Sequence, residues 1–351
     1  MKKNLRLGPF AAVILIPLLI FTAFVAIVDP FFHYHGPLPG IAYTISEERY
    51  QNHGIVRNFD YEAMITGSSE TQNFLASEFG NLWNVNTIKT SFAGGTFKEV
   101  NDLVKVALSN NKNLRYVLRS FDLNLLNTDK DALGYDNYPT YLYDKNPLND
   151  YQYIFNKKVV LMAGMDILDG MMGKETTSFD QYARFADGKE YGREAVLRTY
   201  ERSDVYEEKM ELKEEDYKRI EGNITQNIIE TAKAYPDVTF YFFIPPYSVC
   251  YWDTNVRGNS LDYVMDEIEF ALSKLVEVDN VKVFSFCDKI DIAENLDNYI
   301  DTLHYSAEVN TFILESMKND QGLMTKENYK DHIENLRKLY GEYDYEWIYE
   351  E

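Results

Sequence analysis

The feature that most constrains this chain is a long uncharged stretch close to its N-terminus. Residues 7–28 carry no charge; Lys2, Lys3 and Arg6 precede them and Asp29 follows. As a helix with a rise of about 1.5 Å per residue, the stretch would span about 33 Å, enough to cross a hydrocarbon core of roughly 30 Å. We therefore expect residues 1–28 to form a basic flank and a transmembrane anchor.

A cleaved signal peptide is the main alternative for this segment, because it also has a basic start and an apolar middle. Signal cleavage needs small residues at the −3 and −1 positions. Ala23 and Ala26 each have a phenylalanine two residues before them, Phe21 and Phe24, so neither makes a good cleavage site. We favour an uncleaved anchor. The positive-inside rule keeps the basic flank in the cytoplasm and places everything after Asp29 outside the cell membrane.

The composition excludes several classes of protein. The chain has 35 basic and 56 acidic residues, for a net charge of −21. Such a surface repels phosphate backbones, so we expect no nucleic-acid partner. The 28 tyrosines and 21 phenylalanines supply ample apolar surface for a folded core, which argues against disorder.

The cysteines and histidines show no metal-ligand spacing. Cys250 and Cys287 are the only cysteines, too few for a disulfide framework. A single bridge between them is chemically allowed outside the cytoplasm, and two separate thiols in or near the core are the alternative. The sequence predicts neither a metal nor a cofactor.

Beyond the anchor, short apolar runs alternate with segments of helical periodicity. We expect five strands, at residues 63–65, 86–92, 114–121, 239–244 and 281–286. Most are followed by a crossover helix, which predicts a mainly parallel sheet covered on both faces. The handedness of such crossovers makes a three-layer α/β/α sandwich the expected fold class.

The alternation breaks between residues 125 and 205, a stretch rich in tyrosine and asparagine. It is longer than an ordinary connection, which favours an insertion that acts as a lid or a partner surface near the strand ends. The acidic, aromatic C-terminus reads as a solvated end. The expected organisation is therefore an anchor, a stalk, an α/β domain with an insertion, and a C-terminal helix and tail, at residues 1–28, 29–54, 55–320 (insertion 125–205) and 321–351.

Three polar features follow predicted strands, where ligands gather in open α/β sheets. They are Gly67-Ser68-Ser69-Glu70, Gly94-Gly95 and Asp301-Thr302-Leu303-His304. A serine on a sharp turn before a helix exposes its hydroxyl and lies beside free N–H groups that can bind an oxyanion. Histidine is a suitable base near neutral pH, and an aspartate three residues earlier can orient it. Each feature alone is more often a turn or surface polarity; their order along the chain makes a shared site the better hypothesis.

This order of motifs resembles the SGNH/GDSL hydrolase superfamily, and with the anchor it looks most like membrane-anchored DltD-type and other cell-envelope acyl-transfer proteins. The resemblance implies an SGNH/flavodoxin-like domain in which Ser69 is the nucleophile, His304 the base and Asp301 its orienting acid. It further implies oxyanion donors at the Ser69 N–H, at Gly94 or Gly95, and at the side chain of Asn124. Two departures stand out: Ser68 replaces the usual Asp, and the third block lacks its glycine.

The resemblance implies a serine esterase or O-acyltransferase that acts on a cell-envelope polymer such as teichoic acid or exopolysaccharide. The expected partners are the membrane, that glycopolymer and a membrane-bound O-acyltransferase. Two alternatives stay open: a catalytically inert SGNH-like protein that binds glycan or such a partner, and a purely structural anchored protein. The catalytic hypothesis requires Ser69 Oγ and a ring nitrogen of His304 to lie about 3 Å apart.

Overall fold

The computed structural model describes residues 7–135, 138–144, 146–186 and 188–349; the basic flank of Lys2, Lys3 and Arg6 lies outside them. The chain divides into two compact units. We name residues 1–59 and 137–178 the N-terminal unit, and residues 60–136 and 179–351 the α/β unit. The stretch expected as one insertion, 125–205, is thus divided between the two units.

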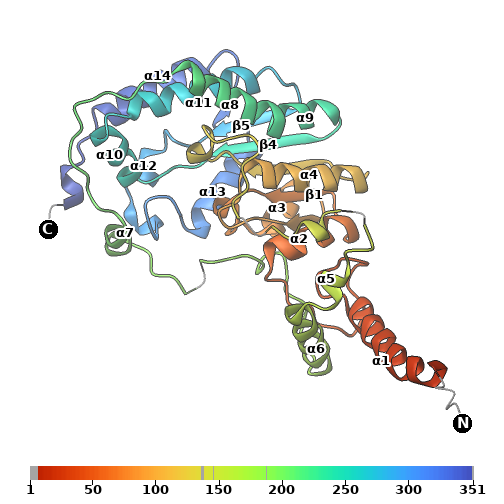
Figure 1. Ribbon diagram of the computed structural model, residues 1–351. Helices are drawn as coiled ribbons and strands as arrows, with labels where there is room; N and C mark the ends of the chain where they lie inside the picture. The colour runs from red at the N-terminus through yellow and green to blue at the C-terminus, as the bar shows by residue number, and fades with distance from the viewer. Residues whose placement is uncertain (1–6, 136–137, 145, 187, 350–351) are drawn as a thin grey trace, which may run out of the picture. The chain divides into compact units, whose positions relative to one another are not determined.

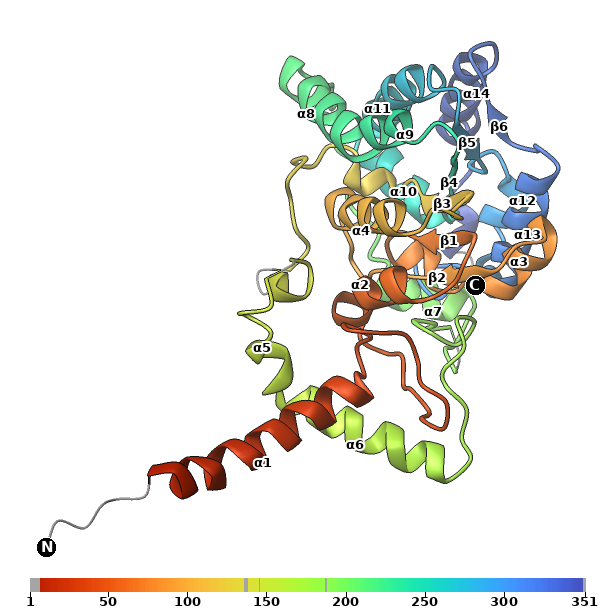
Figure 2. The ribbon, with the colours of Figure 1, turned by 90° about the vertical axis from the view of Figure 1, so that its right-hand side faces the viewer.

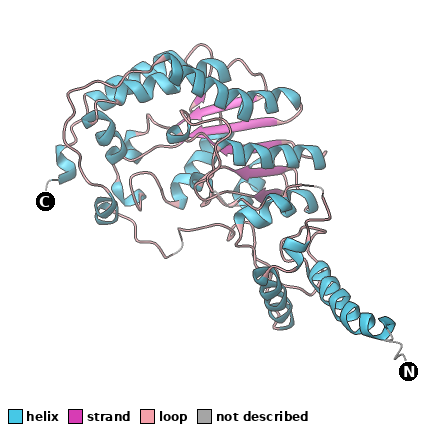
Figure 3. Ribbon diagram, in the orientation of Figure 1, coloured by secondary structure: helices cyan, strands magenta, loops and turns pink. Residues whose placement is uncertain are grey.

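The α/β unit is built on one twisted sheet (Figures 1 and 3). Its strand order is β2-β1-β3-β4-β5-β6, with the first five strands parallel and β6 antiparallel to β5. The strands are β1 (Ala63–Thr66), β2 (Thr87–Lys89), β3 (Tyr116–Ser120), β4 (Thr239–Ile244), β5 (Val281–Ser285) and β6 (Leu323–Met324). The expected mainly parallel sheet is confirmed. The sequence did not reveal β6, because two residues are too few to show a periodic pattern.

Helices cover both faces of this sheet, which confirms the three-layer sandwich (Figure 2). One face carries α4 (Phe97–Asn110), α8 (Glu214–Ile224), which continues through the π-helical η4 (Thr225–Ile229) into α9 (Glu230–Ala234), and α11 (Leu261–Leu275). The other face carries α3 (Ala76–Trp83) and α13 (Ala307–Lys318). The remaining elements of the unit are α7 (Arg193–Thr199), α10 (Val249–Arg257), α12 (Ile290–Ala293), α14 (Tyr329–Gly341), η1 (Ser69–Thr71), η2 (Leu123–Leu125), η5 (Leu296–Asn298) and η6 (Glu346–Tyr349).

Local sequence explains where these elements begin and which of them are central. Thr96 starts α4 through a capping box: its hydroxyl accepts from Glu99 N at 3.2 Å, while the Glu99 carboxylate accepts from Thr96 N at 3.1 Å. The apolar run of β4 is buried from Phe240 to Ile244. This suits a strand with helices on both sides.

The C-terminal segment is packed, so the expectation of a solvated end was wrong. Tyr340 stacks on Trp252 with ring centroids 4.2 Å apart, and Ile348 is fully buried. The Arg193 guanidinium donates to the carbonyl of Ile348 at 2.6 Å. Aromatic side chains, rather than the acidic residues between them, decide where this segment lies.

The N-terminal unit contains α1 (Leu7–Val28), α2 (Glu48–Asn58), η3 (Thr140–Leu142), α5 (Tyr151–Ile154) and α6 (Lys157–Met171). Residues 29–54, expected to be a stalk, are folded here around a buried carboxylate. Asp29 accepts hydrogen bonds from three successive backbone N–H groups, those of residues 33–35, and from the hydroxyl of Tyr153 at 2.6 Å. This carboxylate holds the chain in a tight loop at the end of α1.

Helix α1 has the length and composition of a membrane span or of a signal sequence. Between residues 11 and 28, only a small share of its residues is buried within the protein. Most of the large apolar side chains along it, from Val13 to Ile27, are exposed.

Candidate functional site

The first part of the site is the turn that follows β1. Gly67 has φ of +152°, and a Cβ at this position would lie 2.5 Å from Ser120 Oγ, so only glycine fits. The chain then turns into the short helix η1, of which Ser69 is the first residue. Ser69 is half-buried. Its hydroxyl therefore sits at the carboxyl end of a central strand, where the sequence analysis expected it.

The second part is a loop 235 residues further along the chain, and it reaches Ser69 directly. His304 Nε2 lies 2.8 Å from Ser69 Oγ, and His304 Nδ1 lies 2.7 Å from Asp301 Oδ2. The other oxygen of Asp301 accepts from the backbone N–H groups of Leu303 and His304, both at 2.8 Å. The three residues thus form the hydrogen-bonded chain that a serine nucleophile, its base and an orienting acid require.

The electrostatics of this pair favour a base held in one orientation. Burial alone would raise the pKa of Asp301, but the hydrogen bond and charge of His304, with the two backbone N–H donors, outweigh it and lower that pKa. For His304, burial would lower the pKa, but the hydrogen bond to Asp301 and the nearby carboxylates outweigh it and raise that pKa. Asp301 therefore stays ionised beside the ring.

The loop that carries His304 is held on both sides. Its ends pair as an isolated bridge between Tyr299 and Tyr305, and Ile300 N donates to the carbonyl of His304 at 3.0 Å. Ser248, at the start of α10, donates its hydroxyl to the carbonyl of Thr302 at 2.8 Å. These bonds restrict the loop to one conformation, so the ring of His304 is pre-positioned.

A second, buried polar network lies beside Ser69, and the sequence did not reveal it. Asp122, just after β3, accepts from Ser68 Oγ at 2.6 Å and from Ser120 Oγ at 2.7 Å. Burial raises the pKa of Asp122, although the two serine hydroxyls and Arg119 partly offset this effect. Asp122 thus fixes the turn before Ser69 from the neighbouring strand. Ser68 standing in place of Asp was the available signal.

Glu70 is a third acidic group at the site, and it is fully buried. Burial raises its pKa to about 8, partly offset by the charge of His304, so the carboxyl is largely protonated at pH 7. One of its oxygens, Oε2, has no hydrogen-bond partner among the described residues. Tyr305 donates to the backbone carbonyl of Glu70 at 3.3 Å, which joins the nucleophile turn to the histidine loop.

The residues expected as oxyanion donors differ in whether their donor groups are free and near Ser69. Among the described residues, no acceptor is bonded to the backbone N–H of Ser69 or of Gly94, whereas Gly95 N donates to Phe92 O at 3.0 Å. Gly94 has φ of +56° in this turn. Asn124 lies in η2 with an exposed side chain, and no contact within the described ranges joins it to Ser69 or His304. The structure thus leaves two backbone donors open and brings Asp122, rather than Asn124, to the site.

An aromatic side chain from the stretch 125–205, Phe185, covers the ring of His304. Phe185 meets the ring of His304 edge-on, with centroids 5.2 Å apart. The side chain of Asn73 accepts from the N–H groups of Phe185 and Ala186 at 3.2 and 3.1 Å, which fixes this segment. The part of residues 125–205 that follows position 178 therefore reaches the strand ends, as expected for a lid.

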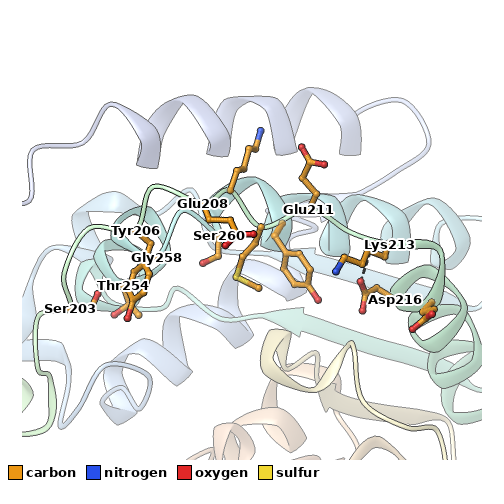
Figure 4. A pocket seen from close by; sticks show the side chains of 13 residues that line it. Ser203, Tyr206, Glu208, Glu211, Lys213, Asp216, Thr254, Gly258 and Ser260 are labelled. Atoms are coloured by element: carbon orange, nitrogen blue, oxygen red, sulfur yellow. Dashed lines mark hydrogen bonds between the residues drawn. The ribbon is translucent and has the colours of Figure 1, made fainter.

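A cavity of about 430 Å³ borders this segment. Its lining includes Arg184 and Ala186, on either side of Phe185, and residues 306–308, which follow the histidine loop. A larger open pocket of about 950 Å³ lies between residues 203–216 and residues 254–263 (Figure 4). Neither the larger pocket nor the smaller cavity is lined by Ser69, Asp301 or His304; the smaller cavity lies beside the segment that carries Phe185.

Cys250 and Cys287 are both buried free thiols, and burial raises the pKa of each to about 12. The disulfide alternative is therefore not realised. In the part of the chain that the structure describes, no group of three or more His, Cys, Asp or Glu side chains could hold a metal ion.

No protein-family model and no curated protein sequence matches the chain. One solved structure, described as "a putative platelet activating factor from Streptococcus pneumonia", is similar over 78% of this chain and 90% of its own. The identity is 10% and the TM-score 0.39. The two structures agree too loosely for this likeness to bear on the chemistry of the chain.

Proposed function

We propose that the chain is a membrane-anchored, extracytoplasmic serine esterase or O-acyltransferase of SGNH/GDSL type. The observation that carries the proposal is the unbroken chain of hydrogen bonds from Ser69 through His304 to Asp301, with distances of 2.8 and 2.7 Å. These residues come from two segments far apart in sequence and meet at the carboxyl ends of parallel strands. Such an arrangement performs acyl transfer in unrelated folds.

In the proposed reaction, Ser69 Oγ attacks the carbonyl carbon of an ester while His304 Nε2 takes its proton. The N–H groups of Ser69 and Gly94 are the proposed donors to the oxyanion that forms. Collapse of this intermediate breaks the bond to the alcohol, which leaves with the proton from His304. Water or a sugar hydroxyl then attacks the acyl-enzyme and gives its proton to His304 Nε2. The bond between the acyl carbon and Ser69 Oγ breaks, and Ser69 Oγ takes the proton back from His304.

The proposed substrate is an O-acylated cell-envelope polymer such as teichoic acid or an exopolysaccharide. The support is the apolar helix α1, which as an uncleaved anchor would confine the α/β unit to the outer membrane surface. A membrane-bound O-acyltransferase is the proposed source or acceptor of the acyl group, as in the DltD-type systems that the sequence resembles.

The direct test is Ser69→Ala in the full chain. The purified variant is assayed with an activated ester as substrate, and the same variant is expressed in cells. Because the turn is held by Gly67, Ser68 and Asp122, removing one hydroxyl should leave the fold intact. Ester turnover should fall by about three orders of magnitude or more. His304→Ala should cause a similar loss, and the double variant little more, because the residues act as a unit.

The result that would overturn catalysis is wild-type cellular function in Ser69→Ala at equal protein abundance. Retained binding of glycan or of the acyltransferase by that variant would then favour the inert, ligand-binding alternative. Ser91→Ala is a suitable control, because Ser91 is a buried serine whose hydroxyl accepts from Thr71 and which is not a member of the Ser69–His304–Asp301 chain.

A further inference from the structure

Helix α6 of the N-terminal unit has an apolar face that is exposed on the surface of the protein. Five large apolar side chains are between 56% and 79% exposed: Leu161, Met165, Leu168, Met171 and Met172. Positions 161, 165, 168 and 172 are three or four residues apart, so they form one continuous stripe along the helix. Exposed apolar stripes of this kind mark sites that contact protein or lipid.

The opposite side of α6 contains a carboxylate and faces inward. Asp166 is fully buried; its Oδ1 accepts from Thr44 N, and its carbonyl accepts from Ala42 N, both at 3.1 Å. A Cβ on Gly170 would lie 2.3 Å from the carbonyl of Gly40. These contacts fix the rotation of the helix about its axis. The apolar stripe therefore cannot turn inward without leaving a buried carboxylate without its partners.

The position of α6 along α1 indicates what covers the stripe. Phe21 of α1 stacks on Phe155, the residue that ends α5, with centroids 5.7 Å apart. Val25 of α1 and Val159 of α6 belong to the same apolar cluster. Phe21 lies seven residues before Val28, about 10 Å along a helix axis. The start of α6 thus lies beside the last two turns of α1, which is visible where the two helices cross in Figure 2.

We infer that α6 is a second membrane-contacting element, embedded in the outer leaflet with its Leu/Met stripe against lipid acyl chains. The inference rests on the membrane anchor in the proposed function. If Val28 marks the outer end of the hydrocarbon core, Phe155 lies roughly 10 Å inside it, the depth at which interfacial helices bury their apolar faces. Two attachments, rather than one, then hold the N-terminal unit in the membrane.

The test uses spin labels on the full chain in vesicles of phosphatidylcholine with a minority of phosphatidylglycerol. Single cysteines replace Leu161, Leu168 or Met172, and Val205→Cys in the α/β unit, 66% exposed in the native chain, is the control. The native cysteines are buried, which directs the label to the introduced thiol. At the α6 positions, the ratio of collision rates with oxygen and with a water-soluble nickel chelate should be several-fold higher than at position 205.

The alternatives give separate results. Labels on α6 that the nickel chelate reaches freely, on protein that still floats with the vesicles, would overturn the inference and leave the anchor intact. Immobile labels that neither reagent reaches would overturn it in favour of a second copy of the chain as the occupant. Protein that does not float with vesicles would overturn both this inference and the anchor, while the hydrolase test on Ser69 would be unaffected.

Discussion

The two units of the chain differ in where they bury polar groups and in how much apolar surface they expose. In the α/β unit, apolar strands fill the interior, and the buried polar groups lie mostly at the carboxyl ends of the strands. In the N-terminal unit, Asp29 and Asp166 are buried, while α1 and α6 expose most of the large apolar side chains found on the surface. The α/β unit thus gathers polar groups around one site, whereas the N-terminal unit leaves apolar side chains exposed along two helices, as surfaces that contact protein or lipid do.

Buried carboxylates therefore have different tasks in the two units. Asp29 and Asp166 accept backbone N–H groups and hold loops in place. Asp301 also accepts backbone N–H groups, but its second oxygen orients the ring of His304 beside a serine hydroxyl. Burial alone does not identify a catalytic acid. The contact of Asp301 with His304, which in turn contacts Ser69, distinguishes Asp301 from Asp29 and Asp166.

The comparison predicts its largest effect for Asp301→Asn. The amide can still accept from the N–H groups of Leu303 and His304, so folding should be preserved, but it cannot select the same ring tautomer of His304. We expect kcat/KM for an activated ester to fall roughly 10⁴-fold, measured beside a thermal melting curve. A loss below about tenfold with the fold intact would show that Asp301 is as structural as Asp29.

The same substitution in the other unit, Asp29→Asn, should have the reverse result. It weakens charge-assisted bonds from three backbone N–H groups and Tyr153, which should destabilise the local structure by about 2 kcal/mol. Hydrogen exchange across residues 29–36 should then quicken by roughly 30-fold, with kcat/KM unchanged. A clear loss of activity without faster hydrogen exchange would show that Asp29 affects catalysis rather than only the local structure of its unit.

Glu70→Gln should change how stability depends on pH. The folded-state pKa of Glu70 is about 8, above its ordinary value of 4.5, so its favourable contribution is complete below about pH 4.5 and is lost as pH rises to 8. Relative to the variant, the free energy of unfolding of the wild type should fall by up to about 1.4 kcal/mol per pH unit across this window. Melting temperatures between pH 5 and 9 measure this, with exposed Glu315→Gln as the matched control. If the difference in melting temperature between Glu70→Gln and the wild type does not change with pH, Glu70 is not a buried acid with a raised pKa.

Phe185→Ala should have the smallest effect. Loss of its edge-on contact with His304 should weaken positioning by about 1 kcal/mol, or roughly fivefold in kcat/KM. Phe155→Ala, at an exposed ring of the N-terminal unit, should leave kcat/KM unchanged. Steady-state assays compare the two variants. Equal kcat/KM values for Phe185→Ala and Phe155→Ala would refute a positioning role for Phe185.

Sequence patterns predicted the α/β unit well because its strands and helices are defined locally. Strand β4 has the expected bounds of Thr239–Ile244. The positions of Ser69, Asp301 and His304 at strand ends followed from the same alternation. The catalytic hypothesis predicted about 3 Å between Ser69 Oγ and a ring nitrogen of His304, and the distance is 2.8 Å. The bonds from Ser248 and Tyr305 that hold the histidine loop in this position could not be predicted, because they join distant segments.

The N-terminal unit could not be predicted because its contacts join segments that are distant in sequence. Nothing in residues 29–54 shows that Asp29 bonds to Tyr153, so that stretch read as a stalk. The apolar residues of α6 were visible, but their outward direction depends on where Asp166 and Gly170 find partners. In the same way, the bond between Ser68 and Asp122 links two strands, and no single motif contains it.

The most direct test of the central claim is the site of covalent modification by a fluorophosphonate. The full wild-type chain is treated with the probe, its turnover of an activated ester is followed, and peptides are mapped by mass spectrometry. We predict one adduct per chain on Ser69, formed in step with loss of turnover and absent in His304→Ala. Turnover that persists while Ser69 is fully modified, or an adduct on another serine that accounts for the inactivation, would contradict the account.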